Sequence, residues 1–187
     1  MKYEMEHVMI DLETLGVNDN APVLSIGATY FNPFMGTRGP DFYETINLTS
    51  SVAAGAKPDM DTVIWWLQQS EEARRDIINA SLPIDEVLRR FSHFCKMYGK
   101  DIQVWGNGAT FDLTILKNAY RSVNRELPWK FWNERDVRTV VELGKAVGIN
   151  PKATTYLDGI EHNALHDARY QVTYLSIIWQ KLTGVAH

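Results

Sequence analysis

The chain has 187 residues and a mass of 21.4 kDa, with 45% hydrophobic and 22% charged residues, proportions typical of one soluble globular domain. No stretch approaches the roughly 20 apolar residues that a membrane span needs. The acidic first segment, MKYEMEHVMIDLE, does not fit a signal peptide. We therefore expect a single domain over residues 1–187, cytoplasmic and without a membrane partner.

The formal net charge is −4, from 19 basic and 23 acidic residues. A protein that coats a long nucleic acid usually has a strong basic excess, because neutralising many phosphates drives its affinity. The charge therefore excludes a tight binder with a long footprint, but not a protein that contacts a short piece of nucleic acid. The single cysteine, Cys95, lies in an apolar helical pattern, which predicts a buried thiol in a reducing compartment.

The first half of the chain has the pattern of β-strands separated by turns. A polar start followed by an apolar run predicts a strand at His7–Leu12. Side chains alternate with a period of two over Val23–Phe31 and Asp41–Leu48, as in a half-buried strand. Turn-forming residues occupy 18–22 and 32–36, between these segments. The simplest arrangement is an antiparallel meander of three strands.

Helices follow, with one further strand among them. Short consecutive helices are predicted at Asp61–Gln69 and Glu71–Asn79, with Asp61 and Ser70 as N-caps. The remaining predicted elements are a helix at Asp85–Tyr98, a strand at Asp101–Trp105, a helix that starts near Thr110, a helix at Asp136–Val147, a polar loop at Asn150–Asn163 and a helix at Ala164–Leu182. This order predicts an α/β fold with a mixed sheet flanked by helices.

Acidic side chains stand at three places where a folded core does not favour them. Asp11 and Glu13 come near the end of the first predicted strand, and the period of two points both to the same face. Two like charges about 5–7 Å apart repel each other unless a cation lies between them. Asp112 follows a predicted strand and its glycine turn, and Asp167 falls in the first turn of the last helix, shortly after His162.

These residue types point to phosphoryl chemistry. Carboxylates suit hard divalent cations such as Mg²⁺ or Mn²⁺, which take oxygen ligands. Two such ions about 3.5–4 Å apart can activate a water molecule and stabilise the leaving oxygen of a phosphodiester. A neutral histidine nearby can take the proton from that water. The sequence therefore predicts hydrolysis assisted by two divalent cations, Mg²⁺ or Mn²⁺.

The acidic positions form three motifs, Asp11-x-Glu13, Asn107-x-x-x-Phe111-Asp112 and His162-x-x-x-x-Asp167. In this order they resemble the motifs of the DEDDh (DnaQ-like) 3′–5′ exonuclease superfamily, from residue 8 to about residue 182. The segment TVIWWLQQSEEAR at 62–74 is similar to a branch of short single-domain enzymes that includes T-even phage exonuclease A and a mycobacterial exoribonuclease. The resemblance implies a ribonuclease-H-like fold.

The resemblance also implies a role for each motif residue. Asp11 would bridge both metal ions. Glu13 and Asp167 would hold the first ion, and Asp112 would reach the second. His162 would be the general base.

Further residues bear on the substrate. Thr14 and Leu15 lie where the family holds the terminal nucleotide. Adjacent tryptophans on a helix face different directions, so we expect Trp65 in the core, whereas Trp66 fits the core and a base-stacking site equally well. His166 is an extra histidine beside the third motif, and we expect it to face away from the site. The basic residues between 121 and 138 are expected to form a solvated face, with one or two contacting backbone phosphates.

Together these observations predict a 3′–5′ exonuclease that releases nucleoside monophosphates from single-stranded DNA or RNA 3′ ends. A ribonuclease-H-like endonuclease is one alternative, which the spacing of His162 disfavours. A non-catalytic nucleic-acid-binding module on the same fold is another, and the complete set of motif residues disfavours it. Homodimers are common in the family, but no stripe in this sequence indicates one. The choice between DNA and RNA stays open, because no side chain can be assigned to the 2′-hydroxyl.

Overall fold

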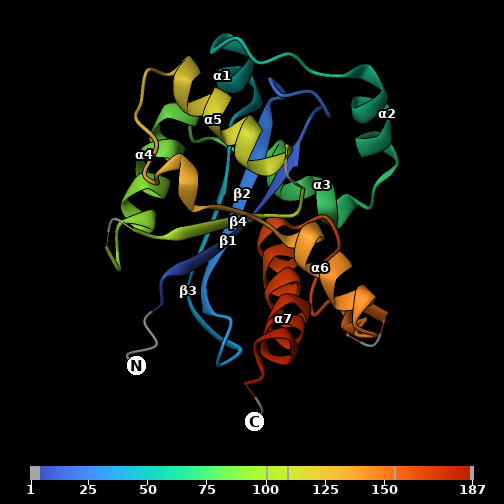
Figure 1. Ribbon diagram of the computed structural model, residues 1–187. Helices are drawn as coiled ribbons and strands as arrows, with labels where there is room; N and C mark the ends of the chain where they lie inside the picture. Colours follow the sequence, from blue (N-terminus) through green and yellow to red (C-terminus); the bar gives the residue numbers. More distant parts are fainter. Residues whose placement is uncertain (1–4, 100, 109, 154, 186–187) are drawn as a thin grey trace.

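The computed structural model describes residues 5–99, 101–108, 110–153 and 155–185 (Figure 1). Its sheet has five strands in the order β3-β2-β1-β4-β5. β1 (His7–Thr14) pairs antiparallel with β2 (Val23–Asn32), which pairs antiparallel with β3 (Thr37–Thr45). On the other side of β1, β4 (Gln103–Gly106) and then β5 (Glu134–Asp136) add parallel strands. The sheet is mixed, as predicted.

Helices flank both faces of this sheet. They are α1 (Leu48–Ala53), α2 (Met60–Gln68), α3 (Glu71–Ile78), α4 (Ile84–Cys95), α5 (Asp112–Ser122), α6 (Val137–Ala146) and α7 (Ala164–Thr183), with short 3₁₀ helices η1 (Phe131–Asn133) and η2 (Pro151–Ala153). In Figure 1, α6 and α7 lie on one side of the strands and α4 and α5 on the other. Among the described residues, no helix combines the length and apolar character that crossing a membrane requires.

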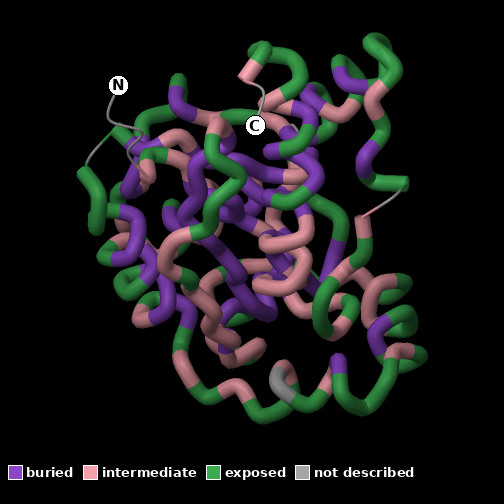
Figure 2. Tube along the Cα trace, turned by 90° about the horizontal axis from the view of Figure 1, so that it is seen from below, coloured by how far each residue is buried: buried purple, intermediate pink, exposed green. Residues whose placement is uncertain are grey.

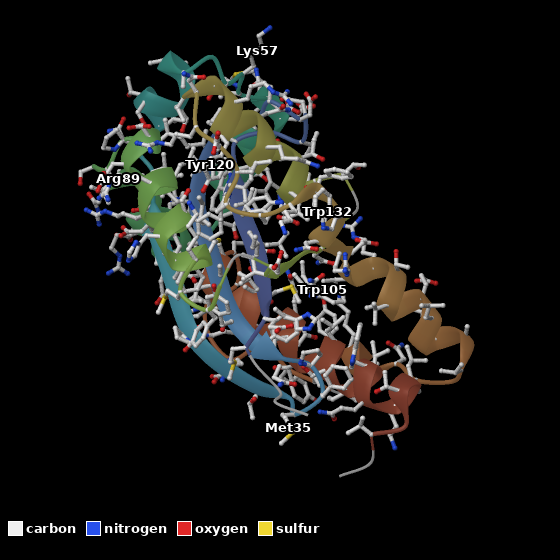
Figure 3. The ribbon with its side chains drawn as sticks, turned by 60° about the vertical axis from the view of Figure 1, so that its left-hand side comes forward. Met35, Lys57, Arg89, Trp105, Tyr120 and Trp132 are labelled. Atoms are coloured by element: carbon white, nitrogen blue, oxygen red, sulfur yellow. The ribbon has the colours of Figure 1, made fainter. Side chains whose placement is uncertain are left out.

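β1 is the strand on which the two cores meet. Val8 and Ile10 pack on the α4–α5 side, in one cluster, whereas Met9 packs on the α6–α7 side, in another. Trp105 and Tyr120, labelled in Figure 3, belong to the α6–α7 and α4–α5 clusters respectively. β2 beside β1 is buried along its whole length, and Figure 2 shows the buried chain running through the centre of the molecule. The strand that carries the first acidic motif is therefore held from both sides.

The start of α7 lies directly against β2 at Gly27. A Cβ atom on Gly27 would stand 2.1 Å from the backbone carbon of Ala164, far closer than real side chains pack. Gly27 is also the partner of Asp11 in the β1–β2 ladder. The missing side chain thus lets the first turn of α7 approach the part of the sheet that carries Asp11.

The predicted meander is confirmed, but its third strand was misplaced. It runs over Thr37–Thr45 rather than Asp41–Leu48, because Asn47 caps α1 by accepting a hydrogen bond from the Ser50 N–H. The sequence pattern missed this helix. It also missed β5, which has three residues and no alternation long enough to detect.

Helix starts were partly predicted. Ser70 caps α3 as expected, whereas α2 is capped by Asp59 rather than Asp61, which lies in the first turn. Three other bounds differ: α4 ends at Cys95 rather than Tyr98, β4 is Gln103–Gly106 rather than Asp101–Trp105, and α5 begins at Asp112 rather than near Thr110. The polar loop predicted at 150–163 contains η2, and its residue 154 lies outside the described residues. The Cys95 thiol is buried, as predicted.

Replacing Gly27 with Ala tests the close approach of α7. The new methyl group would meet backbone rather than a flexible side chain, so we expect the free energy of unfolding to fall by roughly 1–3 kcal/mol or more. Chemical denaturation measures the change. Gly39→Ala is the matched control, because its methyl group would meet side chains and not backbone, the Met5 sulfur at 3.0 Å and the Tyr30 Cβ at 3.2 Å. An equal or larger loss in the control would contradict the close approach.

Candidate active site

Acidic side chains from two distant parts of the chain meet at the end of β1. Asp11 and Glu13 lie on β1, and Asp167 lies in the first turn of α7. One carboxylate oxygen of each lies within 4.8 Å of the other two, a group that could hold a metal ion. The predicted common face of Asp11 and Glu13 is confirmed by this geometry. The packing of α7 at Gly27 brings the third carboxylate to them.

Asp112 lies beside this group but is held more firmly. It begins α5 just after β4, and only 2% of it is exposed. Its Oδ1 accepts a hydrogen bond from the Leu12 N–H over 3.2 Å, and its Oδ2 accepts one from the Asn107 N–H over 3.0 Å. Asp112 is therefore fixed to both β1 and the turn after β4. Its negative charge contributes to the raised pKa of Asp11, so the two carboxylates act on each other.

The four carboxylates of the site all have raised pKa values. Burial raises the pKa of Asp11 well above its usual value, and the charges of Asp112, Glu13 and Asp167 raise it further. Burial, followed by the charges of Asp167 and Asp112, raises the pKa of Glu13 to about 8. Burial raises the pKa of Asp112 to about 6 against the effect of its backbone donors, and burial also raises the pKa of Asp167. A cation between these carboxylates would relieve their repulsion, and their oxygen donors fit a hard divalent cation.

His162 stands at the rim of the acidic group. It has a φ of 62°, in the left-handed region that residues other than glycine rarely adopt. Its backbone N–H and its ring both lie close enough to the Asp167 carboxyl group to lower the pKa of that group, against the larger effect of burial. The imidazole ring contacts Trp65 edge-on, with ring centroids 4.8 Å apart. The left-handed turn therefore ties the histidine to both the acids and the helix α2.

A cleft of about 530 Å³ opens next to the acids. Its lining residues are Leu12, Glu13, Thr14, Gly16, Val17, Asp59, Asp61, Thr62, Trp65, Trp66 and Phe111. This volume lies in the range of pockets that hold small organic ligands. Because Glu13 belongs to both the cleft and the acidic group, a molecule in the cleft would lie beside the carboxylates.

Trp65 was expected to be buried in the core, but of the two tryptophans it is Trp66 that is buried. Trp66 is the buried one, 6% exposed, and its indole N–H donates to the carbonyl oxygen of Thr14 over 2.9 Å. Trp65 is 39% exposed and lines the cleft, so the prediction that it fills the core was wrong. The rotation of α2 decides between them, and the cap at Asp59 that sets where α2 begins was not predicted. Leu15 is buried and does not line the cleft, unlike Thr14.

The structure also shows a contact that sequence reasoning missed. The Gln171 amide donates from Nε2 to Oδ1 of Asp11 over 2.7 Å. A signal existed, since Gln171 follows Asp167 at the helical spacing that places both on one face of α7. The ring of His166 turns to the loop before α7, where its Nδ1 accepts a hydrogen bond from the Ile160 N–H over 2.9 Å.

Most of the basic stretch between 121 and 138 is engaged within the protein. Arg125 pairs with Asp85, and the Arg135 guanidinium donates to backbone carbonyls. Arg138 differs, because it lies against the turn at Gly108 and its charge lowers the pKa of Asp112.

Comparison with known proteins relates this geometry to a family. Residues 6–179 match the 3′-5′ exoribonuclease Rv2179c-like domain. The exodeoxyribonuclease of Enterobacteria phage T4 is 29% identical over 210 residues, covering 95% of this chain and 90% of that protein.

Solved structures share the fold at low sequence identity. The nuclease domain of 3′hExo, a DEDDh family member bound to rAMP, has a TM-score of 0.64 at 10% identity, covering 98% of this chain and 94% of that one. S. pombe Pop2p in a form with Mg²⁺ and Mn²⁺ bound has a TM-score of 0.65 at 11% identity, covering 97% and 86%. The solved structures show the fold. The family model covers most of the chain, so the chain belongs to the Rv2179c-like 3′–5′ exoribonuclease domain family.

Proposed function

We propose that this 3′–5′ exonuclease works with two divalent cations, Mg²⁺ or Mn²⁺, bound by Asp11, Glu13, Asp112 and Asp167. The observation that carries the proposal is the meeting of three carboxylates within 4.8 Å from β1 and α7. Bound divalent cations lower the pKa of water and offset the charge on a phosphodiester, which is the chemistry that phosphodiester hydrolysis needs.

The carboxylates divide the binding between them. Asp11 has repulsive contacts with Glu13, Asp112 and Asp167, which suits a position between two cations. Glu13 and Asp167 would complete the first cation's ligands. Asp112 would serve the second, in part through water, since both its oxygens already accept backbone N–H bonds.

His162 would act as the general base that takes a proton from the attacking water. His162 lies beside the Asp167 carboxyl group, whose pKa it lowers, and it is not part of the group of carboxylates that could hold a metal ion. The imidazole contacts Trp65, which lines the cleft, and this contact supports a place for His162 beside the substrate position. Because a general base must be unprotonated, activity should fall in acid solution.

The cleft would receive the terminal nucleotide. Thr14 and Trp66 line it directly, and Leu15 packs against Trp66 behind the wall. The indole N–H of Trp66 donates to the Thr14 carbonyl oxygen. Trp65 offers an exposed indole to a base, a contact worth about 1–3 kcal/mol per base. An aromatic wall favours an unstacked nucleotide and therefore single-stranded ends. The exoribonuclease and exodeoxyribonuclease relatives make both RNA and DNA candidate substrates.

Digestion of matched DNA and RNA oligonucleotides, single- and double-stranded and labelled at the 5′ end, tests the proposal. With Mg²⁺ or Mn²⁺ the labelled product should shorten stepwise from the 3′ end and release nucleoside monophosphates, and single strands should be degraded faster. A chelator should stop the reaction, because the carboxylates alone do not activate water. Internal cuts, or full activity in the chelator, would contradict it.

Glu13→Gln tests both the repulsion between Glu13 and the neighbouring carboxylates and the role of Glu13 as a metal ligand. Since the folded pKa of Glu13 is raised to about 8, the metal-free folded state binds more protons than the unfolded state between roughly pH 4.5 and 8, and its stability falls as pH rises through that window. The variant removes this loss, so metal-free Tm should exceed that of the wild type at pH 8 and match it near pH 4.5.

Mn²⁺ should raise the Tm of the wild type, more at pH 8 than at pH 6, and have little effect on Glu13→Gln, because bound cations replace protons on the carboxylates. Glu72→Gln, an exposed position in α3, is the control and should behave like the wild type. A Glu13→Gln protein that kept the full Mn²⁺ response would remove Glu13 from the ligands.

His162→Ala should lower kcat by about 100-fold or more, the contribution typical of a general base. Calorimetric titration with Mn²⁺ should give an affinity close to that of the wild type, because the imidazole is not a ligand. His93→Ala, which removes an exposed histidine of α4, should leave kcat unchanged. Retention of full activity by the His162→Ala enzyme would assign the base to another group.

A further inference from the structure

Gln171 lies in α7 shortly after Asp167 and reaches the same carboxylate group. Residues at this helical spacing share a face, so both side chains extend towards β1. The amide of Gln171 donates to Oδ1 of Asp11 over 2.7 Å, and only 4% of Gln171 is exposed. The bond therefore lies inside the protein and joins α7 to the central strand.

The NH₂ group of the amide is the end that contacts Asp11. This is the orientation that an ionised Asp11 requires, because a carboxylate would repel the amide oxygen. The other end, Oε1, is buried and has no hydrogen-bond partner within the described part of the chain. A buried acceptor without a partner destabilises the folded state, because it has lost its hydrogen bonds to water. Ala168, Val172 and Leu175 nearby in α7 are buried apolar residues, so an apolar side chain would suit the packing better.

A neutral donor is what this position requires. Glutamate would add a fifth carboxylate to a group whose members already repel one another, and lysine would place its own positive charge where a cation is needed. The amide of Gln171 adds no charge. It fixes the rotation of the Asp11 carboxyl group and leaves Oδ2 of Asp11 without a hydrogen bond among the described residues.

We propose that Gln171 is a positioning residue, whose amide holds the Asp11 carboxylate in the orientation that bound divalent cations require. This inference rests on the proposed function, because it needs Asp11 to be a metal ligand. Gln171 does not line the cleft, and its amide contacts Asp11, so it would act through Asp11. Loss of a hydrogen-bond partner behind a metal ligand typically lowers metal affinity or activity by about 10–100-fold.

Gln171→Met tests the role directly, because methionine keeps the length and approximate volume of glutamine but has no donor. The variant should fold and unfold cooperatively near the wild-type temperature, since it also removes the buried unpaired oxygen. Its Mn²⁺ affinity, measured by calorimetry without substrate, should fall about 10–100-fold. KM for a single-stranded oligonucleotide at saturating Mn²⁺ should be unchanged.

Two further variants test whether the loss of Mn²⁺ affinity comes from the contact of Gln171 with Asp11 or from the removal of any buried polar group in α7. Gln171→Asn keeps an amide that is one methylene too short to reach Asp11, and it should lose Mn²⁺ affinity as Gln171→Met does. Ser176→Ala removes another buried unpaired polar group from α7, and it should bind Mn²⁺ like the wild type. Wild-type affinity in Gln171→Asn would overturn the proposal, and so would an equal loss in Ser176→Ala.

Failure of this inference is distinguishable from failure of the proposed function. If the wild-type protein binds Mn²⁺ and degrades 3′ ends while Gln171→Met binds Mn²⁺ equally well, the role of Gln171 is refuted and the function stands. If the wild-type protein neither binds Mn²⁺ nor depends on it for exonuclease activity, the proposed metal site is refuted, and the role of Gln171 with it.

Discussion

Carboxylates buried side by side repel one another, and the fold has to hold them together against that repulsion. Asp11 and Glu13 share one face of β1, and α7 brings Asp167 within 4.8 Å of both. Apolar packing on the two faces of β1 keeps the strand in place, and the absence of a side chain at Gly27 lets α7 approach. The free energy of apolar burial thus offsets the electrostatic cost of the site.

The acids are held unequally, and this inequality bears on function. Asp112 accepts two backbone N–H bonds and Asp11 accepts one amide bond, whereas Glu13 has no hydrogen bond among the described residues. The anchored acids fix the geometry of the site. Under the proposed function, Glu13, with a pKa raised to about 8, would exchange its proton for a cation near neutral pH. The repulsion that destabilises the metal-free fold would then contribute to affinity for divalent cations.

The sequence revealed the local features of this site and missed those that depend on packing. The common face of Asp11 and Glu13 follows from strand geometry alone, so alternation was enough to predict it. The bond between Gln171 and Asp11 joins residues 160 positions apart. The spacing of Gln171 from Asp167 places both on one face of α7, but no local pattern pairs that face with β1. Trp65 was placed in the core because two adjacent tryptophans do not reveal how their helix is rotated. The order of the acidic motifs, not any physical pattern, joined Asp167 to β1.

The most direct test is a crystal structure of the protein with Mn²⁺, recorded with X-rays at the manganese absorption edge. Anomalous peaks should lie between the carboxylates of Asp11, Glu13 and Asp167, with a second ion on the side of Asp112. If an active preparation binds manganese elsewhere and these carboxylates hold no metal, the account is contradicted, because it requires divalent cations to offset the repulsion between these carboxylates.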